Sequence, residues 1–109
     1  MVIGPLSSVL SPDEIEIVRG SLRAMVSGGF IPEWEFQTVV GVNRETVRAV
    51  LEAWPRQTLA QDEFADALIG SLNNLVGYPH GMDDELRRYV PEGRVAIMAV
   101  LDDLRILGF

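Results

Sequence analysis

The strongest constraint on this chain is a series of helix start and stop signals that divides it into amphipathic segments. The first signal is the tetrapeptide Ser-Pro-Asp-Glu at residues 11–14. A serine can cap a helix, proline fits the first turn, and a glutamate three residues on can bond back to the cap. Apolar residues then recur on one helical face as far as Val26, and the glycines at 28 and 29 end the segment. We therefore expect a long helix here.

The same alternation of start signals, apolar faces and breakers continues to the end of the chain. Pro32 begins a second segment that Gly41 ends, and Asn43 can cap a third that Pro55 ends. Further helices are expected over residues 62–76, 83–89 and 92–107. The apolar run 95–101 would also suit a buried strand, but no second strand candidate exists to pair with it.

The sequence thus predicts an all-α fold, a small single-domain bundle of about five to six helices. Residues 1–10 are expected to form a loosely ordered tail, and residues 11–109 a single helical domain. No internal repeat is apparent from the sequence. Two tryptophans, Trp34 and Trp54, fall near apolar stripes and are expected in the core, and of the pair Asn73 and Asn74 the first is expected to bond to backbone.

Composition limits the compartment and the partners. The chain has 109 residues, no cysteine and a net charge of −7. Without cysteine there is no disulfide framework, and no apolar stretch approaches the ~20 residues of a membrane span. We expect a cytoplasmic protein without membrane contact, whose acidic field repels nucleic acid and attracts basic proteins.

One segment, residues 33–52, resembles a helix-turn-helix motif, within a helix pair expected at residues 32–54. Gly41 stands at the ninth position of the motif, where a turn glycine is usual. Apolar residues occupy the positions that lock the two helices together: Phe36, Val40, Val42, Val47 and Val50. The fifth position carries Gln37 instead of the usual small residue, which suggests a wider crossing of the helices.

The resemblance implies a DNA-binding regulator as one hypothesis for the function. Its base-reading and phosphate-binding residues would be Asn43, Arg44, Thr46 and Arg48. On the exposed face, however, the two arginines are balanced by two glutamates, and the chain contains no lysine. Nucleic acid is therefore the less favoured partner, and an ordinary pair of capped helices is the favoured explanation of the pattern.

The sequence offers only one weak candidate for a catalytic or metal-binding site. The single histidine, His80, precedes Asp83 and Asp84 in a loop that also contains Tyr78. This cluster could ligate a divalent ion, but acidic residues at a helix start are already explained by the helix dipole. We expect no catalysis, cofactor or metal, and leave open whether the loop recognises a partner or packs as a lid with a solvated histidine.

The last expected helix is apolar nearly all round. Its core face would carry Ile97, Val100, Leu101 and Leu104, whereas Val95, Ala99 and Ile106 fall toward the opposite side. A helix of this kind is either central to the fold or covered by another chain. A homodimer through residues 92–107 and complete burial both remain open.

The favoured hypothesis is a small acidic protein-binding module that neutralises or regulates a basic partner, as immunity, antitoxin or anti-effector proteins do. Acidic surface steers association with such a partner. The expected contacts lie on the second and third helices and around the histidine loop: Glu33, Glu35, Glu45, Glu52, Tyr78, His80, Asp83, Asp84 and Glu85.

Overall fold

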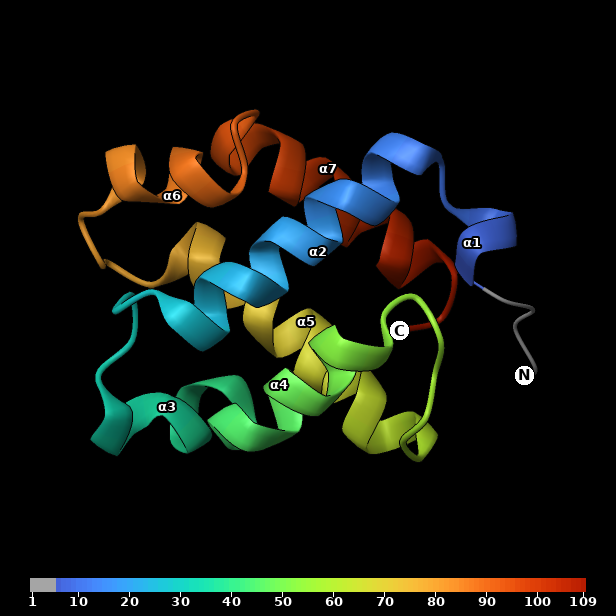
Figure 1. Ribbon diagram of the computed structural model, residues 1–109, viewed down its shortest axis with the longest axis horizontal. Coiled ribbons are helices and arrows are strands. Elements are labelled where there is room, and N and C mark those ends of the chain that lie inside the picture. The colour runs from blue at the N-terminus through green and yellow to red at the C-terminus, as the bar shows by residue number, and fades with distance from the viewer. Residues whose placement is uncertain (1–5) are drawn as a thin grey trace.

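The computed structural model describes residues 6–109, and the secondary structure in that range is entirely α-helical (Figure 1). The elements are α1 (Leu6–Val9), α2 (Pro12–Ser27), α3 (Glu33–Val40), α4 (Arg44–Ala53), α5 (Gln61–Gly77), α6 (Asp83–Tyr89) and α7 (Gly93–Ile106). The predicted all-α bundle is confirmed, and its six expected helices correspond to α2 through α7.

The predicted helix starts form as their sequences require. Ser11 Oγ accepts a hydrogen bond from the Glu14 amide at 3.1 Å, and the Glu14 carboxylate accepts one from the Ser11 amide at 2.9 Å. This reciprocal capping box begins α2. Asn43 caps α4 by accepting from the Thr46 amide at 2.9 Å. Gly41 adopts a φ of 101°, which ends α3 in the left-handed conformation expected of a turn glycine.

The tail expected over residues 1–10 falls partly outside the described residues, which begin at residue 6. Leu6–Val9 form the single turn α1, and Leu10 is buried in the core next to α2. The structured domain therefore begins before the Ser11 cap.

The chain contains an internal repeat that the sequence analysis missed. Helices α5, α6 and α7 repeat α2, α3 and α4 at a spacing of 50 residues. Two tripeptides recur at that spacing: Gly-Ser-Leu at 20–22 and 70–72, and Ala-Val-Leu at 49–51 and 99–101. We call α2–α4 the first unit and α5–α7 the second unit. The first tripeptide lies mid-way along α2 and α5, and the second lies in α4 and α7, so each tripeptide occupies the same place in both units.

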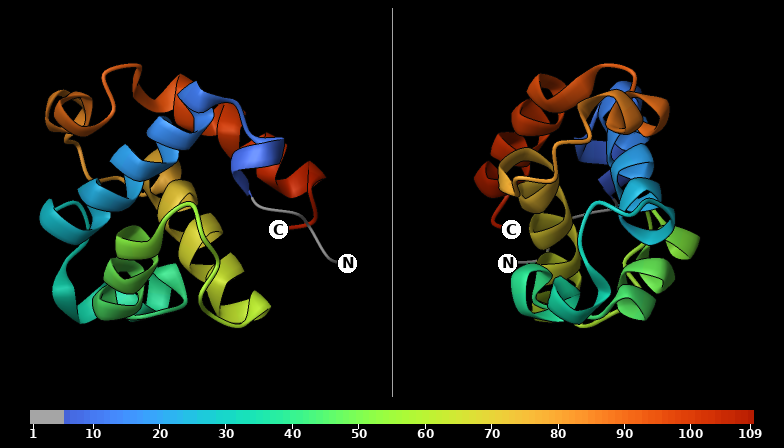
Figure 2. Two further views of the ribbon diagram at one scale, coloured as in Figure 1. Left: turned by 45° about the vertical axis from the view of Figure 1, so that its right-hand side comes forward. Right: turned by 90° about the vertical axis from the view of Figure 1, so that its left-hand side faces the viewer.

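The repeated glycines lie where each unit packs against the other, and the two contacts are equivalent. Gly20 of α2 lies against the end of α6, so that a Cβ there would stand 2.3 Å from the Tyr89 carbonyl oxygen. Gly70 of α5 lies against the end of α3, where a Cβ would stand 2.0 Å from the Val40 carbonyl oxygen. Figures 1 and 2 show the result: α2 and α5 cross at the centre, with α3 and α4 on one side and α6 and α7 on the other. The contacts are those of an approximate twofold relation.

The loop that joins α2 to α3 and the loop that joins α5 to α6 contact each other close to the approximate twofold axis. Phe30 and His80 occupy equivalent positions, and their rings contact edge to face with centroids 5.1 Å apart. Phe30 is buried and also touches Tyr89. The histidine loop is therefore part of the packing between the units.

Asn74 fastens α5 to α3, contrary to the assignment made from the helical wheel. Its Nδ2 donates to the carbonyl oxygens of Val39 at 2.9 Å and Gly70 at 2.7 Å. Asn74 is buried and Asn73 is exposed, so the prediction that Asn73 makes the backbone bond was wrong. The error arose because the end of α3 covers a side of α5 that lies away from the main apolar stripe.

Candidate functional site

Arg44, one of the residues proposed to contact DNA, instead bonds to other parts of the fold. Its Nη1 donates to the Met25 carbonyl oxygen at 2.6 Å, which lies in the last turn of α2. Its Nε and Nη2 bind the Glu33 carboxylate at 2.8 and 2.7 Å, and its guanidinium lies 4.5 Å above the centre of the Phe36 ring. With its donors engaged inside the first unit, Arg44 is poorly placed to bind phosphate or a base.

The other residues proposed for DNA make local contacts at the start of α4. Asn43 Oδ1 accepts from both the amide and the hydroxyl of Thr46. Arg48 lies 3.4 Å from the Glu45 carboxylate one turn earlier. The expected turn and locking residues are in place, with Val42, Val47 and Val50 buried. However, α3 packs chiefly on α5, and α4 packs chiefly on α2.

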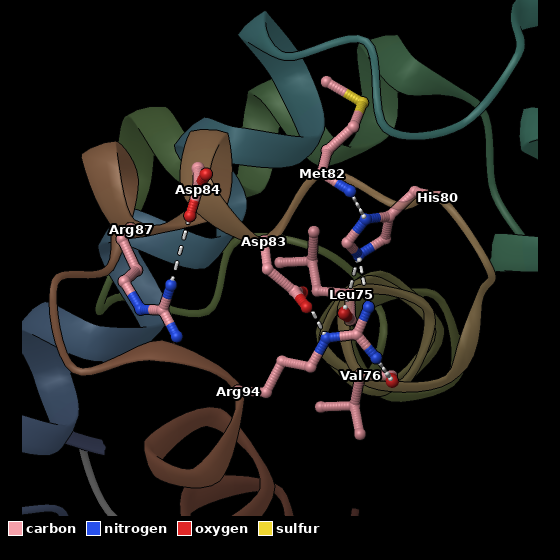
Figure 3. Close-up of polar contacts among 8 residues, drawn as sticks. All are labelled: Leu75, Val76, His80, Met82, Asp83, Asp84, Arg87 and Arg94. Atoms are coloured by element: carbon pink, nitrogen blue, oxygen red, sulfur yellow. Dashed lines mark hydrogen bonds and ion pairs between the residues drawn. The ribbon is translucent and has the colours of Figure 1, made fainter.

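Arg94 repeats the role of Arg44 in the second unit, fifty residues later (Figure 3). Its Nη1 donates to the Val76 carbonyl oxygen near the end of α5 at 2.6 Å, and its Nε donates to the Asp83 carboxylate at 2.6 Å. Each unit thus places an arginine from its third helix between the end of the first helix and an acidic residue at the start of the second. These arginines join three helices in each unit, which is an architectural role.

The acidic residues expected to bind a partner are mostly paired with arginines of the same chain. Glu33 and Asp83 hold Arg44 and Arg94. The remaining pairs are exposed and lie one helical turn apart: Glu45 with Arg48, Asp84 with Arg87, and Glu85 with Arg88. Exposed pairs of this kind are weak, so they lower the local charge without fixing the side chains. Glu52 is exposed on α4.

Hydrogen bonds hold the side chain of His80 against α5 and the start of α6 (Figure 3). Nδ1 of His80 accepts from the Met82 amide at 2.9 Å, which leaves Nε2 to donate to the Leu75 carbonyl oxygen at 3.0 Å. Arg94 Nη2 lies 3.4 Å from the same Nε2, and His80 is half-buried. The Tyr78 hydroxyl donates to Glu35 at 2.5 Å, and this bond, aided by burial and the carboxylate charge, raises the pKa of Tyr78. The loop is a packed, bonded element, and His80 is not simply solvated.

The outer side of α7 carries three of the five large apolar side chains that are exposed among the described residues. Val95, Met98, Ala99, Asp102 and Ile106 form it, and we call it the α7 outer face. Val95 is 80 % exposed and Ile106 is 82 % exposed, while Ile97, Val100, Leu101 and Leu104 fill the opposite side with core contacts. Both faces of α7 match the sequence prediction. The apolar outer side is therefore left uncovered by the fold itself.

The repeat supplies an internal comparison for this surface. The positions of α4 and the turn after it that correspond to the α7 outer face are all polar or small: Glu45, Arg48, Ala49, Glu52 and Arg56. Since the same fold is built there with charged side chains, apolar residues on α7 are not required for folding. Their presence indicates a use for the exposed side of the second unit.

Trp34 was expected in the core, and this prediction was wrong. It lies on α3 with 83 % of its surface exposed, whereas Trp54 is buried and donates from its Nε1 to the Ile15 carbonyl oxygen at 3.0 Å. The short helix α3 buries only Phe36 and Val40, four residues apart. Trp34 falls outside that narrow stripe.

The comparisons with known proteins give no match to a protein-family model, to a curated protein or to a solved structure. Among residues 6–109, no helix has the length and apolar character needed to cross a bilayer. In the same range, histidine, aspartate and glutamate side chains do not gather in groups of three or more that could hold a metal ion.

Proposed function

We propose that this protein is a non-catalytic, acidic protein-binding module that docks a basic partner through the α7 outer face. The observation that carries the proposal is the contrast between the two units. Corresponding helices occupy corresponding places, yet α7 exposes Val95, Met98 and Ile106 where the corresponding positions of the first unit carry charged side chains. Exposed apolar surface of this kind marks sites of protein–protein contact.

The charge of the molecule supports a basic partner. Within residues 6–109, six of the nine arginines pair with carboxylates, so the net charge of −7 is carried mainly by acidic side chains outside these pairs. Such a field accelerates encounter with a positively charged protein and weakens as salt is added. A regulator or inhibitor of the immunity, antitoxin or anti-effector type fits this combination of negative charge and a preformed docking side.

The alternative of a DNA-binding regulator receives less support. This alternative depends on Arg44 and Arg48, and each of them pairs with a carboxylate of the same chain. Specific binding to DNA needs several arginines or lysines free to meet phosphates.

The proposal is tested by affinity capture from the native cell with three forms of the protein. The first is the wild type, and the second is Val95→Ser with Ile106→Ser, which removes the two most exposed apolar side chains of the α7 outer face. The third is the matched control Glu45→Ser with Arg56→Ser, at the corresponding positions of the first unit. A basic protein retained by the first and third forms at low salt, and lost by the second, supports the proposal. Equal recovery with all three forms would reject it.

A further inference from the structure

The α7 outer face contains a single charged residue, Asp102, placed within an apolar stripe. Met98 and Ala99 lie one turn before it, and Ile106 lies one turn after it. Asp102 is exposed, and it forms none of the ion pairs found within residues 6–109. A partner that covers the apolar residues must also cover this carboxylate. Covering an unpaired carboxylate is strongly unfavourable, so the partner has to supply a cation or strong donor at this point.

The shape of the stripe indicates what kind of element covers it. Its residues follow the spacing 95, 98, 99, 102 and 106, which keeps them in one row along the helix. At 1.5 Å per residue the row from Val95 to Ile106 is roughly 16 Å long. A straight row of this length on a convex helix is matched by the apolar stripe of another helix of about three turns.

A second copy of the chain fits the row poorly. If two α7 helices paired antiparallel with their stripes fully overlapped, Asp102 would lie opposite Ala99 of the other copy. The two Asp102 carboxylates would then be a helical turn apart in a desolvated contact with no cation between them. Shifting the helices so that Asp102 meets Arg105 of the other copy would leave Val95 uncovered. Two chains of charge −7 also repel each other.

We propose that the α7 outer face binds an amphipathic helix of a partner protein that presents a lysine or arginine opposite Asp102. Apolar residues one turn to either side of that cation pack on Met98 and Ile106. This inference rests on the proposed function and specifies the chemistry of the segment that docks. The apolar rows supply the contact area, and the Asp102 ion pair fixes the register and the orientation of the bound helix.

The test is a selection of helix-forming peptides of about 20 residues, displayed as a library with randomised surface positions. The library is selected on the wild-type protein and depleted on Val95→Ser with Ile106→Ser, whose substitutions are exposed and leave the core intact. We expect a consensus with one lysine or arginine between apolar residues spaced three or four apart. Binding of the consensus peptide, measured by fluorescence anisotropy, should weaken about tenfold or more with Asp102→Lys. Exchange of the peptide cation for glutamate should restore binding to that variant.

Other outcomes overturn the inference. A stripe-dependent consensus without a basic residue, a basic consensus indifferent to Asp102→Lys, or no stripe-dependent peptide at all would each do so. Light scattering that shows a dimer at micromolar concentration, dissociated by Val95→Ser with Ile106→Ser, would identify a second copy as the occupant instead. If the captured natural partner depends on α7 but docks a neutral or acidic segment, the proposed protein-binding function stands and only this inference fails.

Discussion

Replacement of Arg44 by alanine tests whether this residue belongs to the fold or to a DNA-binding face. The side chain is only 18 % exposed, and the substitution removes its charged hydrogen bond to the Met25 carbonyl oxygen. Such bonds contribute about 1.5–3 kcal/mol. The contact over Phe36 adds about 0.5–1 kcal/mol, and the pair with exposed Glu33 adds up to about 1 kcal/mol. We expect Arg44→Ala to lower the free energy of unfolding by about 2–4 kcal/mol, since such terms are not fully additive.

The assay is thermal unfolding followed by circular dichroism, with urea titration to obtain the free energy. A loss of that size should lower Tm by about 10–20 °C in a domain of this length. Arg48→Ala is the matched control on the same helix. It removes only an exposed pair with Glu45, so its effect should stay below about 0.5 kcal/mol. Similar small losses for both variants would refute the architectural role assigned to Arg44 and restore it as a candidate for ligand binding.

Three further predictions concern the contacts between helices. Gly70→Ala should lower the free energy of unfolding in urea by about 1–3 kcal/mol, because the added Cβ would collide with the α3 backbone. Gly77→Ala, at the last residue of α5, is the control and should cause no such loss because its Cβ would meet open space. Asn74→Ala should cost about 1–2 kcal/mol and Asn73→Ala almost nothing; equal losses would contradict the assigned bonds. The hydrogen bond to Glu14 raises the pKa of Asp103 and lowers that of Glu14, so Asp103 favours folding while protonated and loses this contribution as pH rises through its raised pKa. Asp103→Asn should therefore match the wild type in Tm below pH 4 and exceed it by an amount that grows as pH rises through the raised pKa of Asp103 and then levels off, and a difference that is constant at every pH would count against the pair.

Features set by neighbours along the chain were predictable from the sequence. The Ser11 capping box and the Asn43 cap depend on residues three positions apart, and both form as predicted. The division of α7 into a buried and an exposed face follows from helical periodicity alone. Local chemistry decides these features, so no knowledge of the tertiary arrangement was needed.

Features set by distant partners were not predictable. Asn74 is buried because the end of α3 covers it, and Trp34 is exposed because none of the helices within residues 6–109 covers its side of α3. The helical wheel contains neither fact. Arg44 appeared to be part of a surface motif because its acceptor at Met25 lies 19 positions away in the sequence.

The internal repeat was not predicted from the sequence because most equivalent positions carry different residues, and identity is kept mainly where the architecture requires it. Gly20 and Gly70 recur because a side chain there would strike a neighbouring backbone, and Arg44 and Arg94 recur because each joins three helices. The significance of these scattered identities becomes visible once the two units are seen in contact. The charges of the expected partner-binding residues were likewise visible in the sequence, but their arginine partners were not.

The contact between Phe30 and His80 illustrates what covalent fusion of two similar units permits. In a dimer of identical chains, a side chain on the symmetry axis must meet its own copy, so one residue type has to satisfy both sides of the contact. In a single chain the two halves can differ, and here a purely apolar ring faces one that also bonds to the Leu75 and Met82 backbone. The same independence let one outer helix remain charged while its counterpart became apolar, without any loss of the shared scaffold.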